Sequence, residues 1–152
     1  MGPATSILIS ETFTHALRAE VDVEIQSLSD TVNGEYFWIN GAPFIYSFGW
    51  EYASEQDDYN GLKSKIGWVP QDKLIFAAMR NQQEDYIYLG DLCVRFSGML
   101  KGYVDFGLPL SDYTSDETVL SHSEHIINDG TSFLGPALME IWRHHKDFWM
   151  VK

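Results

Sequence analysis

The sequence predicts a single α+β domain over residues 1–152, built from a mainly antiparallel sheet with two or three helices packed on it. Three observations lead to this prediction. Short β-prone runs recur along the chain, stretches with helical periodicity separate some of them, and a hairpin signal joins two neighbouring runs. The sequence contains no linker, repeat or low-complexity tract, and its length suits one domain that buries roughly two-thirds of its unfolded surface.

The N-terminal part predicts a strand, a helix and a hairpin. Residues 4–10 are β-prone, and Ser10, Glu11 or Thr12 can cap the helix that follows. The next strands, Glu35–Ile39 and Phe44–Phe48, flank Asn40-Gly41, which is a strong signal for a two-residue turn. Residues 29–34 are a break. The helix is predicted from apolar residues at steps of three and four, namely Phe13, Leu17, Val21, Ile25 and Leu28.

The segment from Trp50 to Gly61 is predicted to be a loop or a frayed helix on the surface. It combines three aromatic residues and four acids with no basic residue. Aromatic side chains supply affinity at protein interfaces and charge steers the encounter, so the segment is a candidate surface for a basic partner. The alternative is a solvated loop with one or two aromatics turned inward. The candidate contact residues are Trp50, Glu51, Tyr52, Glu55, Asp57, Asp58 and Tyr59.

The central segment, residues 73–110, predicts a strand, a helix and a second strand. An apolar run that starts at Lys73 has the length of a buried strand. Gly102 is expected to provide a left-handed helix C-cap, and residues 103–106 form the second strand. This unit is expected to be the domain core. One face of its helix carries Leu89, Leu92, Cys93, Phe96 and Leu100.

The C-terminal part has a weaker pattern. Two short β-prone pieces, Thr118–Leu120 and His125–Ile127, are followed by a turn at Asn128–Gly130. Thr131 or Ser132 is expected to cap the last helix, and the aromatic tail after it is expected to dock on the domain. The apolar face of that helix is assigned to Leu134, Leu138, Ile141 and Trp142.

The charge balance excludes some partners. Ten basic and 22 acidic side chains give a net charge of −12. A surface of this sign repels the phosphate backbone of nucleic acids and anionic membranes, and it attracts basic proteins. The alternative is that the acidic surface only keeps the protein soluble. No apolar run approaches a membrane span, no secretory signal precedes the first strand, and the expected location is the cytoplasm.

The motif search predicts no catalytic, cofactor-binding or metal-binding residue. The chain lacks a phosphate-binding glycine loop, a dinucleotide fingerprint, a Gly-x-Ser-x-Gly elbow and an HExxH motif. Asp105-Phe106-Gly107 matches the kinase tripeptide, but the other kinase motifs are missing. His122 and His125, or His144-His145, are weak metal candidates, and Cys93 is expected to be a buried hydrophobe.

Several short stretches together resemble an uncharacterised family of small acidic bacterial proteins. They are Gly2-Pro3, the Gly-x-Val-Asp-Phe-Gly stretch at residues 102–107, Phe133-Leu134 with Trp142, and the tail Asp147–Lys152, whereas residues 35–70 fall outside the resemblance. Members of that family look like immunity proteins of polymorphic toxin systems. The resemblance implies a cytosolic protein that neutralises one cognate toxin, and it carries over no catalytic residue.

Three functions follow as hypotheses. The first is an immunity protein that occludes the basic active-site cleft of a cognate toxin, chiefly with residues 50–59. The second is a small hydrolase that reverses a toxin's modification of its target, with the histidine–acid cluster from His122 to Asp129. The third is a non-catalytic adaptor or a homo-oligomer. The oligomeric state and the identity of the toxin are left open.

Overall fold

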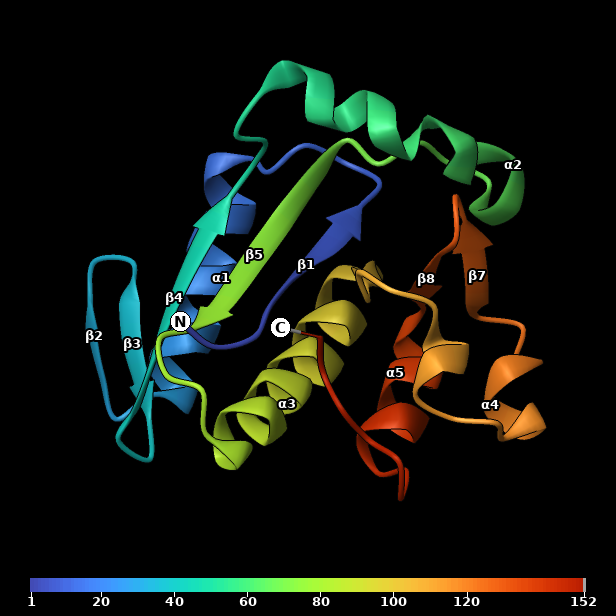
Figure 1. Ribbon diagram of the computed structural model, residues 1–152. Helices are drawn as coiled ribbons and strands as arrows, with labels where there is room; N and C mark the ends of the chain where they lie inside the picture. Colours follow the sequence, from blue (N-terminus) through green and yellow to red (C-terminus); the bar gives the residue numbers. More distant parts are fainter. Residues whose placement is uncertain (152) are drawn as a thin grey trace.

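An eight-stranded sheet forms the centre of the fold, with the strand order β2-β3-β4-β5-β1-β6-β8-β7 (Figure 1). The computed structural model describes residues 1–151. All strand pairs within this range are antiparallel, as the sequence predicts. The strands are β1 (Ala4–Ile9), β2 (Thr31–Asn33), β3 (Tyr36–Ile39), β4 (Ala42–Phe48), β5 (Asp72–Ala78), β6 (Tyr103–Asp105), β7 (His125–Asn128) and β8 (Thr131–Leu134).

Five α-helices and two 3₁₀ helices connect these strands within the described residues. The number of α-helices exceeds the two or three predicted because α2 and α4 are single turns of four residues each. The α-helices are α1 (His15–Leu28), α2 (Lys63–Ile66), α3 (Gln83–Leu100), α4 (Glu117–Leu120) and α5 (Pro136–Arg143), and the 3₁₀ helices are η1 (Ala53–Leu62) and η2 (Leu110–Asp112). None of the described helices is long and apolar enough to cross a membrane.

The main core lies between the sheet and the helices α1, α3 and α5. It contains Phe37, Phe44 and Phe76 of the sheet together with Phe96 of α3 and Trp142 of α5, each of them fully buried. We call the side of the sheet that carries these three phenylalanines the inner face. Antiparallel strands alternate their side chains between two faces, so Leu8 and Phe133 point to the opposite, outer face.

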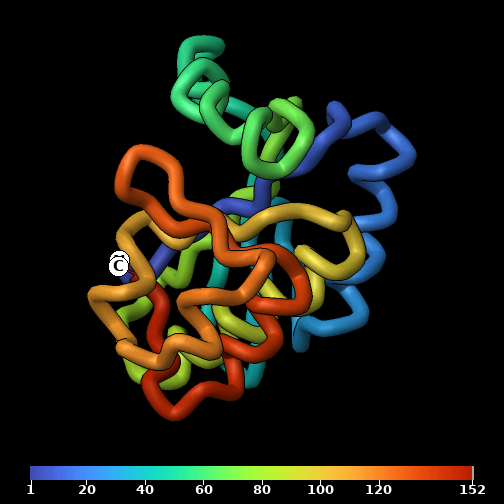
Figure 2. Tube along the Cα trace, turned by 90° about the vertical axis from the view of Figure 1, so that its right-hand side faces the viewer, coloured from blue at the N-terminus to red at the C-terminus, as the bar shows by residue number. Residues whose placement is uncertain are grey.

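The outer face is covered at one end only. There η1 and α2 pack on it, and the buried Leu62 of η1 contacts Leu8 and Phe133 in a second, smaller cluster. In Figure 2 the chain of η1 and α2, coloured green, rises above the rest of the molecule. Among residues 1–151, no helix crosses the remainder of the outer face (Figure 1).

Two predicted helix caps are wrong. The side chain that caps α1 is that of Thr14, whose hydroxyl accepts a hydrogen bond from Leu17 N–H at 3.1 Å. The chain stays extended up to that point because the buried Asp72 carboxylate holds the Phe13 N–H at 2.9 Å. At the end of α3 the left-handed residue is Lys101, with φ of 53°. Gly102 is required for a different reason, since a Cβ there would lie 2.5 Å from the Leu8 carbonyl oxygen.

The C-terminal prediction also requires correction. Thr118–Leu120 belongs to α4, which begins where the Asp116 carboxylate accepts the Thr118 N–H at 2.9 Å. Thr131, Ser132 and Leu134 lie in β8, between β6 and β7, so α5 starts only at Pro136. Pairing with two neighbouring strands overrides the capping preference of the hydroxyl residues. The docking of the tail is confirmed, because Met150 is buried and Trp149 stacks on Tyr86.

Two glycines of α3 provide a matched test of the α3–α5 packing. A Cβ on Gly90 would lie 2.5 Å from the Phe148 ring, whereas a Cβ on Gly98 would meet nothing within 4 Å. Gly98→Ala should therefore raise the free energy of unfolding by about 0.5–1 kcal/mol, the helix-propensity gain of alanine. Gly90→Ala should lower it by about 1–2 kcal/mol, because overpacking outweighs that gain. Urea denaturation measures both, and equal stabilisation by the two changes would contradict the close packing of the tail.

Candidate functional site

The η1 segment, defined as residues 50–62, crosses the ends of the strands on the outer face. Two of its side chains form hydrogen bonds with residues 70–71, which directly precede β5. The Trp50 indole N–H donates to the Gln71 carbonyl at 3.2 Å, and the Gln56 amide donates to the Pro70 carbonyl at 2.9 Å. The segment, predicted to be a loop or a frayed helix, is thus an ordered 3₁₀ helix that packs on the sheet.

Three of the seven candidate contact residues point toward the sheet. The Tyr59 ring lies 5.7 Å from the Trp50 ring and 6.1 Å from the Phe133 ring. Glu55 pairs with Lys73 of β5 at 2.7 Å, and this hydrogen bond lowers the pKa of the Glu55 carboxyl group. These three side chains hold the segment in place, and at least part of the surface of each is covered.

The other four candidate residues are exposed. Tyr52 is 63% exposed, and Glu51, Asp57 and Asp58 also lie on the solvent side of the segment. The segment therefore has an anchored side, with Trp50 and Tyr59, and an acidic side. We call the acidic side, formed by Glu51, Tyr52, Asp57 and Asp58, the η1 acidic face.

A trough runs along the sheet beside the η1 segment. It consists of two hollows, of about 330 Å³ and about 280 Å³, which share Asp105 and Gly107 in their walls. The larger hollow has three carboxylates and two aromatic rings, and the smaller one continues across β1 and β5 past Ser6 and Ile75. The carboxylates and rings of the larger hollow belong to Asp58, Tyr59, Asp105, Asp129 and Phe133.

Asp105 lies at the centre of the trough and is held by two donors. The Tyr59 hydroxyl donates to one carboxylate oxygen and the Gly107 N–H to the other, each at 2.9 Å. Burial raises the pKa of Asp105, because excluding water disfavours the charged form, and the two hydrogen bonds offset part of this effect. Burial and the nearby Asp105 charge likewise raise the pKa of Tyr59. A half-buried carboxylate with a perturbed pKa in a hollow is a common feature of binding sites.

The raised pKa of Asp105 predicts how stability depends on pH. Well below the ordinary Asp pKa of about 4 the carboxyl is neutral in both states, and stability is lost as the pH rises from there through the folded-state pKa, because the unfolded chain ionises more readily. Asp105→Asn keeps both contacts, since the amide oxygen accepts from Gly107 and the amide nitrogen can donate to Tyr59. The variant should therefore equal or exceed the native stability at pH 7, and the difference should vanish at low pH.

Chemical denaturation at several pH values checks this prediction. Asp105→Ala is the control, because it leaves the Gly107 N–H and the Tyr59 hydroxyl without their acceptor and should cost about 1–3 kcal/mol at every pH. A loss of more than about 1 kcal/mol in Asp105→Asn at pH 7 would show that the ionised carboxylate stabilises the fold.

The histidine–acid cluster at residues 122–129 is engaged in structural contacts. His125 joins the Leu120 carbonyl, at 2.8 Å, to the Ser132 hydroxyl, at 2.7 Å. Ser132 is fully buried, and its hydroxyl also accepts the Leu110 N–H at 2.8 Å. Glu124 accepts the Ala137 N–H at the first turn of α5.

The last histidines are separated as well. His145 bonds Asp116 at 2.9 Å and stacks on Trp142, whereas His144 is exposed. Across residues 1–151, no group of three or more His, Cys, Asp or Glu side chains converges in a way that could hold a metal ion. Cys93 is buried, and burial raises the pKa of its thiol, as expected for a core residue.

Sequence reasoning identified the η1 segment but missed the trough. Tyr59 and Asp105 are 46 residues apart, and their hydrogen bond depends on the sheet that brings β6 beneath η1. One signal was available, since Asp105 and Gly107 belong to the Gly-x-Val-Asp-Phe-Gly stretch that carried the family resemblance. The local sequence around Asp105 predicts only the end of a strand.

Comparisons with known proteins give one match. No curated protein and no solved structure matches this sequence. A family model described as a family of unknown function, DUF6368, matches residues 1–152, which is the whole chain. The protein therefore belongs to the DUF6368 family.

Proposed function

We propose that this protein is an immunity protein, which binds a cognate bacterial toxin and neutralises it by covering the toxin's basic active-site cleft. The observation that supports this proposal best is the two-sided η1 segment. Its anchored side fixes the backbone through Trp50, Glu55 and Tyr59, and its acidic face presents three exposed carboxylates beside the exposed Tyr52 ring. A pre-ordered surface loses less conformational entropy on binding than a flexible loop.

The charges favour a basic partner. A net charge of −12 attracts a positively charged protein from a distance and speeds the encounter. Close contact would then depend on Tyr52, because aromatic side chains carry much of the binding energy at interfaces. An inhibitor of this kind acts by covering the active-site cleft of its partner. It needs an ordered binding surface and no catalytic residue of its own.

The trough offers a place for one basic side chain of the toxin. Asp58, Asp105 and Asp129 surround a hollow whose walls include the rings of Tyr59 and Phe133. A lysine or arginine that enters there gains both carboxylate contacts and the face of an aromatic ring. The resemblance to immunity proteins of polymorphic toxin systems, which act in bacterial competition, points to the same class of partner.

Co-expression with the product of the adjacent upstream gene tests the proposal. The expected result is a stable complex on co-purification, together with restored growth of cells that make the toxin. Salt should weaken the complex, because charge steers its formation. Restored growth without a complex would favour a hydrolase that reverses the toxin's modification, and a complex without effect on growth would favour an adaptor. Absence of both would overturn the proposal.

A further inference from the structure

The outer face of the sheet carries an apolar patch in the part that no described helix covers. Its side chains alternate along the strands with Phe37, Phe44 and Phe76 of the inner face, so they point to the opposite side. The register pairs β3 with β4 and β4 with β5, which makes the patch continuous across three strands. We call it the outer-face patch, formed by Tyr36, Trp38, Pro43, Ile45, Ile75 and Ala77.

The outer-face patch has no packing partner in the described part of the chain. Tyr36, Trp38 and Ile45 belong neither to the main core nor to the smaller cluster beneath η1. Tyr36 is 44% exposed, and Trp38 and Ile45 are partly exposed. Tryptophan and tyrosine are the residues that most often carry binding energy at protein interfaces, and an exposed apolar patch with a polar rim marks an interaction site. The patch therefore has the composition of a protein-docking surface.

The outer-face patch borders the trough. Asp105 of β6, Ser6 of β1 and Ile75 of β5 lie in one row across the sheet, and all three line the smaller hollow. Neighbouring strands are about 4.8 Å apart, so Asp105 lies about 10 Å from Ile75. The surface thus changes, over that distance, from carboxylates at the trough to apolar side chains on the patch.

The charges at the trough favour a cationic partner. Asp58, Asp105 and Asp129 form no ion pair with any residue in the range 1–151. Lys73 is the one basic residue among the described walls of the two hollows, and it already pairs with Glu55 at 2.7 Å. The three carboxylates are therefore left for a positive group from outside the chain.

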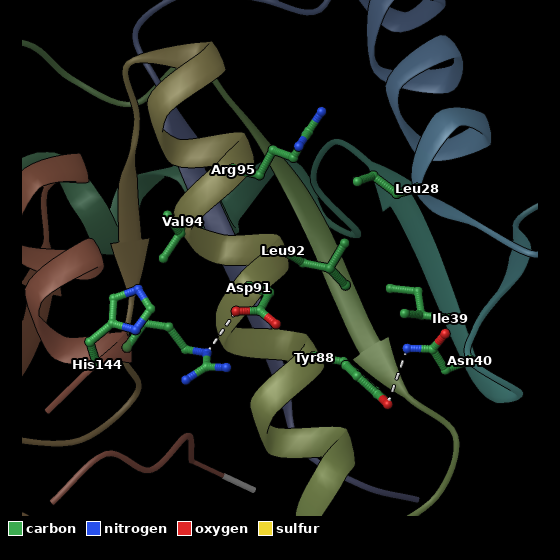
Figure 3. Close-up of a pocket in the computed structure, with 10 residues that line it drawn as sticks. Leu28, Ile39, Asn40, Tyr88, Asp91, Leu92, Val94, Arg95 and His144 are labelled. Carbon is green, nitrogen blue, oxygen red and sulfur yellow. Dashed lines mark hydrogen bonds and ion pairs between the residues drawn. The ribbon is translucent and has the colours of Figure 1, made fainter. Parts of the chain in front are cut away.

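The hollow beside α3, of about 440 Å³, shows the opposite arrangement. Its floor is apolar, and its carboxylate, Asp91, pairs with Arg143 at 2.7 Å (Figure 3). Its other arginine, Arg95, pairs with Glu24 of α1. The charges at this hollow are neutralised within the chain, so Asp91 is a reference for what a paired carboxylate contributes to binding.

We propose that the trough and the outer-face patch together bind a basic amphipathic segment of the partner protein. In that segment a lysine or arginine lies about 10 Å from the first of several apolar side chains. The basic side chain enters the larger hollow near Asp58 and Asp129, and the apolar side chains cover Ile75 and Ile45. A second copy of this chain fits poorly, because two molecules with a net charge of −12 repel each other. This binding mode rests on the proposed function, which makes the toxin the partner, and it adds the chemistry of the segment that is bound.

A synthetic peptide tests the surface without the toxin. Acetyl-Arg-Gly-Gly-Leu-Ile-Leu amide, when extended, places its arginine about 10 Å from its first leucine. In a ¹H–¹⁵N NMR titration of the full chain, the expected shifts lie at residues 36–38, 43–47, 75–77 and 105. The same peptide with glutamine in place of arginine should bind about fivefold more weakly, since the carboxylate contacts lose their charge. No shifts, or shifts confined to the η1 acidic face, would overturn the binding mode.

Two double variants separate the trough from general attraction to an acidic protein. Asp58→Asn with Asp129→Asn removes two unpaired carboxylates and should weaken binding of the arginine peptide by about tenfold. Asp129 has a φ of 49° in its turn, which asparagine also tolerates, so the fold should be retained. Asp91→Asn with Glu140→Gln gives the same net charge of −10 at sites away from the trough, and it should leave binding unchanged. Equal weakening by the two double variants would overturn the role of the trough.

Tyr36→Ser extends the test to the complex with the product of the adjacent upstream gene. It should weaken that complex by about tenfold or more, because an exposed aromatic anchor is lost. Val23→Ser is the control, at a 64% exposed position on α1, and should have no effect. A native complex that Tyr36→Ser leaves unchanged would overturn this binding mode without affecting the proposed function. Peptide shifts on the outer face without any toxin complex would support the surface and overturn the proposed function.

Discussion

Replacing Asp57 and Asp58 with lysine should slow association of the protein with the proposed toxin partner by about tenfold to a hundredfold at low ionic strength. Each change adds two positive units, so the net charge moves from −12 to −8, with the whole difference located on the η1 acidic face. Both side chains are exposed, so the fold should be retained. Charge at an interface acts mainly through the encounter rate, and the effect should shrink as salt is raised.

A second double variant provides the matched control. Glu117→Lys with Glu140→Lys gives the same net charge of −8, and it changes two exposed positions on α4 and α5, outside the η1 segment. Association rates measured at low and high salt should stay near native in this control. If both double variants slow association equally, only the total charge matters. An unchanged rate in the Asp57/Asp58 variant would place the toxin contact elsewhere.

Trp142→Ala should lower the free energy of unfolding by about 3–5 kcal/mol, as expected when a fully buried aromatic side chain is removed. Trp142 is fully buried, and the centroid of its ring lies 6.1 Å from the ring centroid of Phe106 and 6.1 Å from that of Phe148. Its indole N–H donates to the Trp149 carbonyl at 3.0 Å, which ties the C-terminal tail to α5. The alanine variant would lose both the packing and this link.

Two milder changes serve as controls for Trp142. Trp142→Phe keeps most of the packing and loses the hydrogen bond, so it should cost about 1–2 kcal/mol. Ile141→Ala, at the adjacent and 42% exposed position, should cost less than about 1 kcal/mol. Urea denaturation compares the three variants. A Trp142→Ala loss as small as that of Ile141→Ala would mean that the tail and α5 relax into the space left by the ring.

The parts of the fold that the sequence predicted correctly depend on local chemistry. At the β3–β4 turn, Asn40 and Gly41 both have positive φ, and these residue types are the ones that tolerate it. The apolar stripe of α3 likewise follows from residue spacing alone: Leu89, Leu92 and Phe96 are all buried. In such cases neighbours in the chain determine the structure, and the sequence shows them directly.

The parts that were missed depend on contacts between distant residues. Ser132 was expected to cap a helix, but it pairs in β8 and binds Leu110, which is 22 residues earlier in the chain. The same holds for the candidate site. The composition of residues 50–61 identified the segment that contains Tyr59. The Tyr59 ring faces the sheet because it packs on the ring of Phe133, a residue of β8. No local pattern records that contact.

The position of β1 in the sheet has a consequence for synthesis of the protein. β1 lies between β5 and β6 and pairs with both, although it precedes both of them in the chain. β1 can therefore pair on one side only after residues 72–78 have been synthesised, and on the other side only after residues 103–105 have been synthesised. At the usual pace of translation that delay is on the order of 5 to 20 s, during which an apolar strand stays unpaired. Under the proposed function, the protein could protect a cell only after residues 103–105 have been made and β1 is paired on both sides.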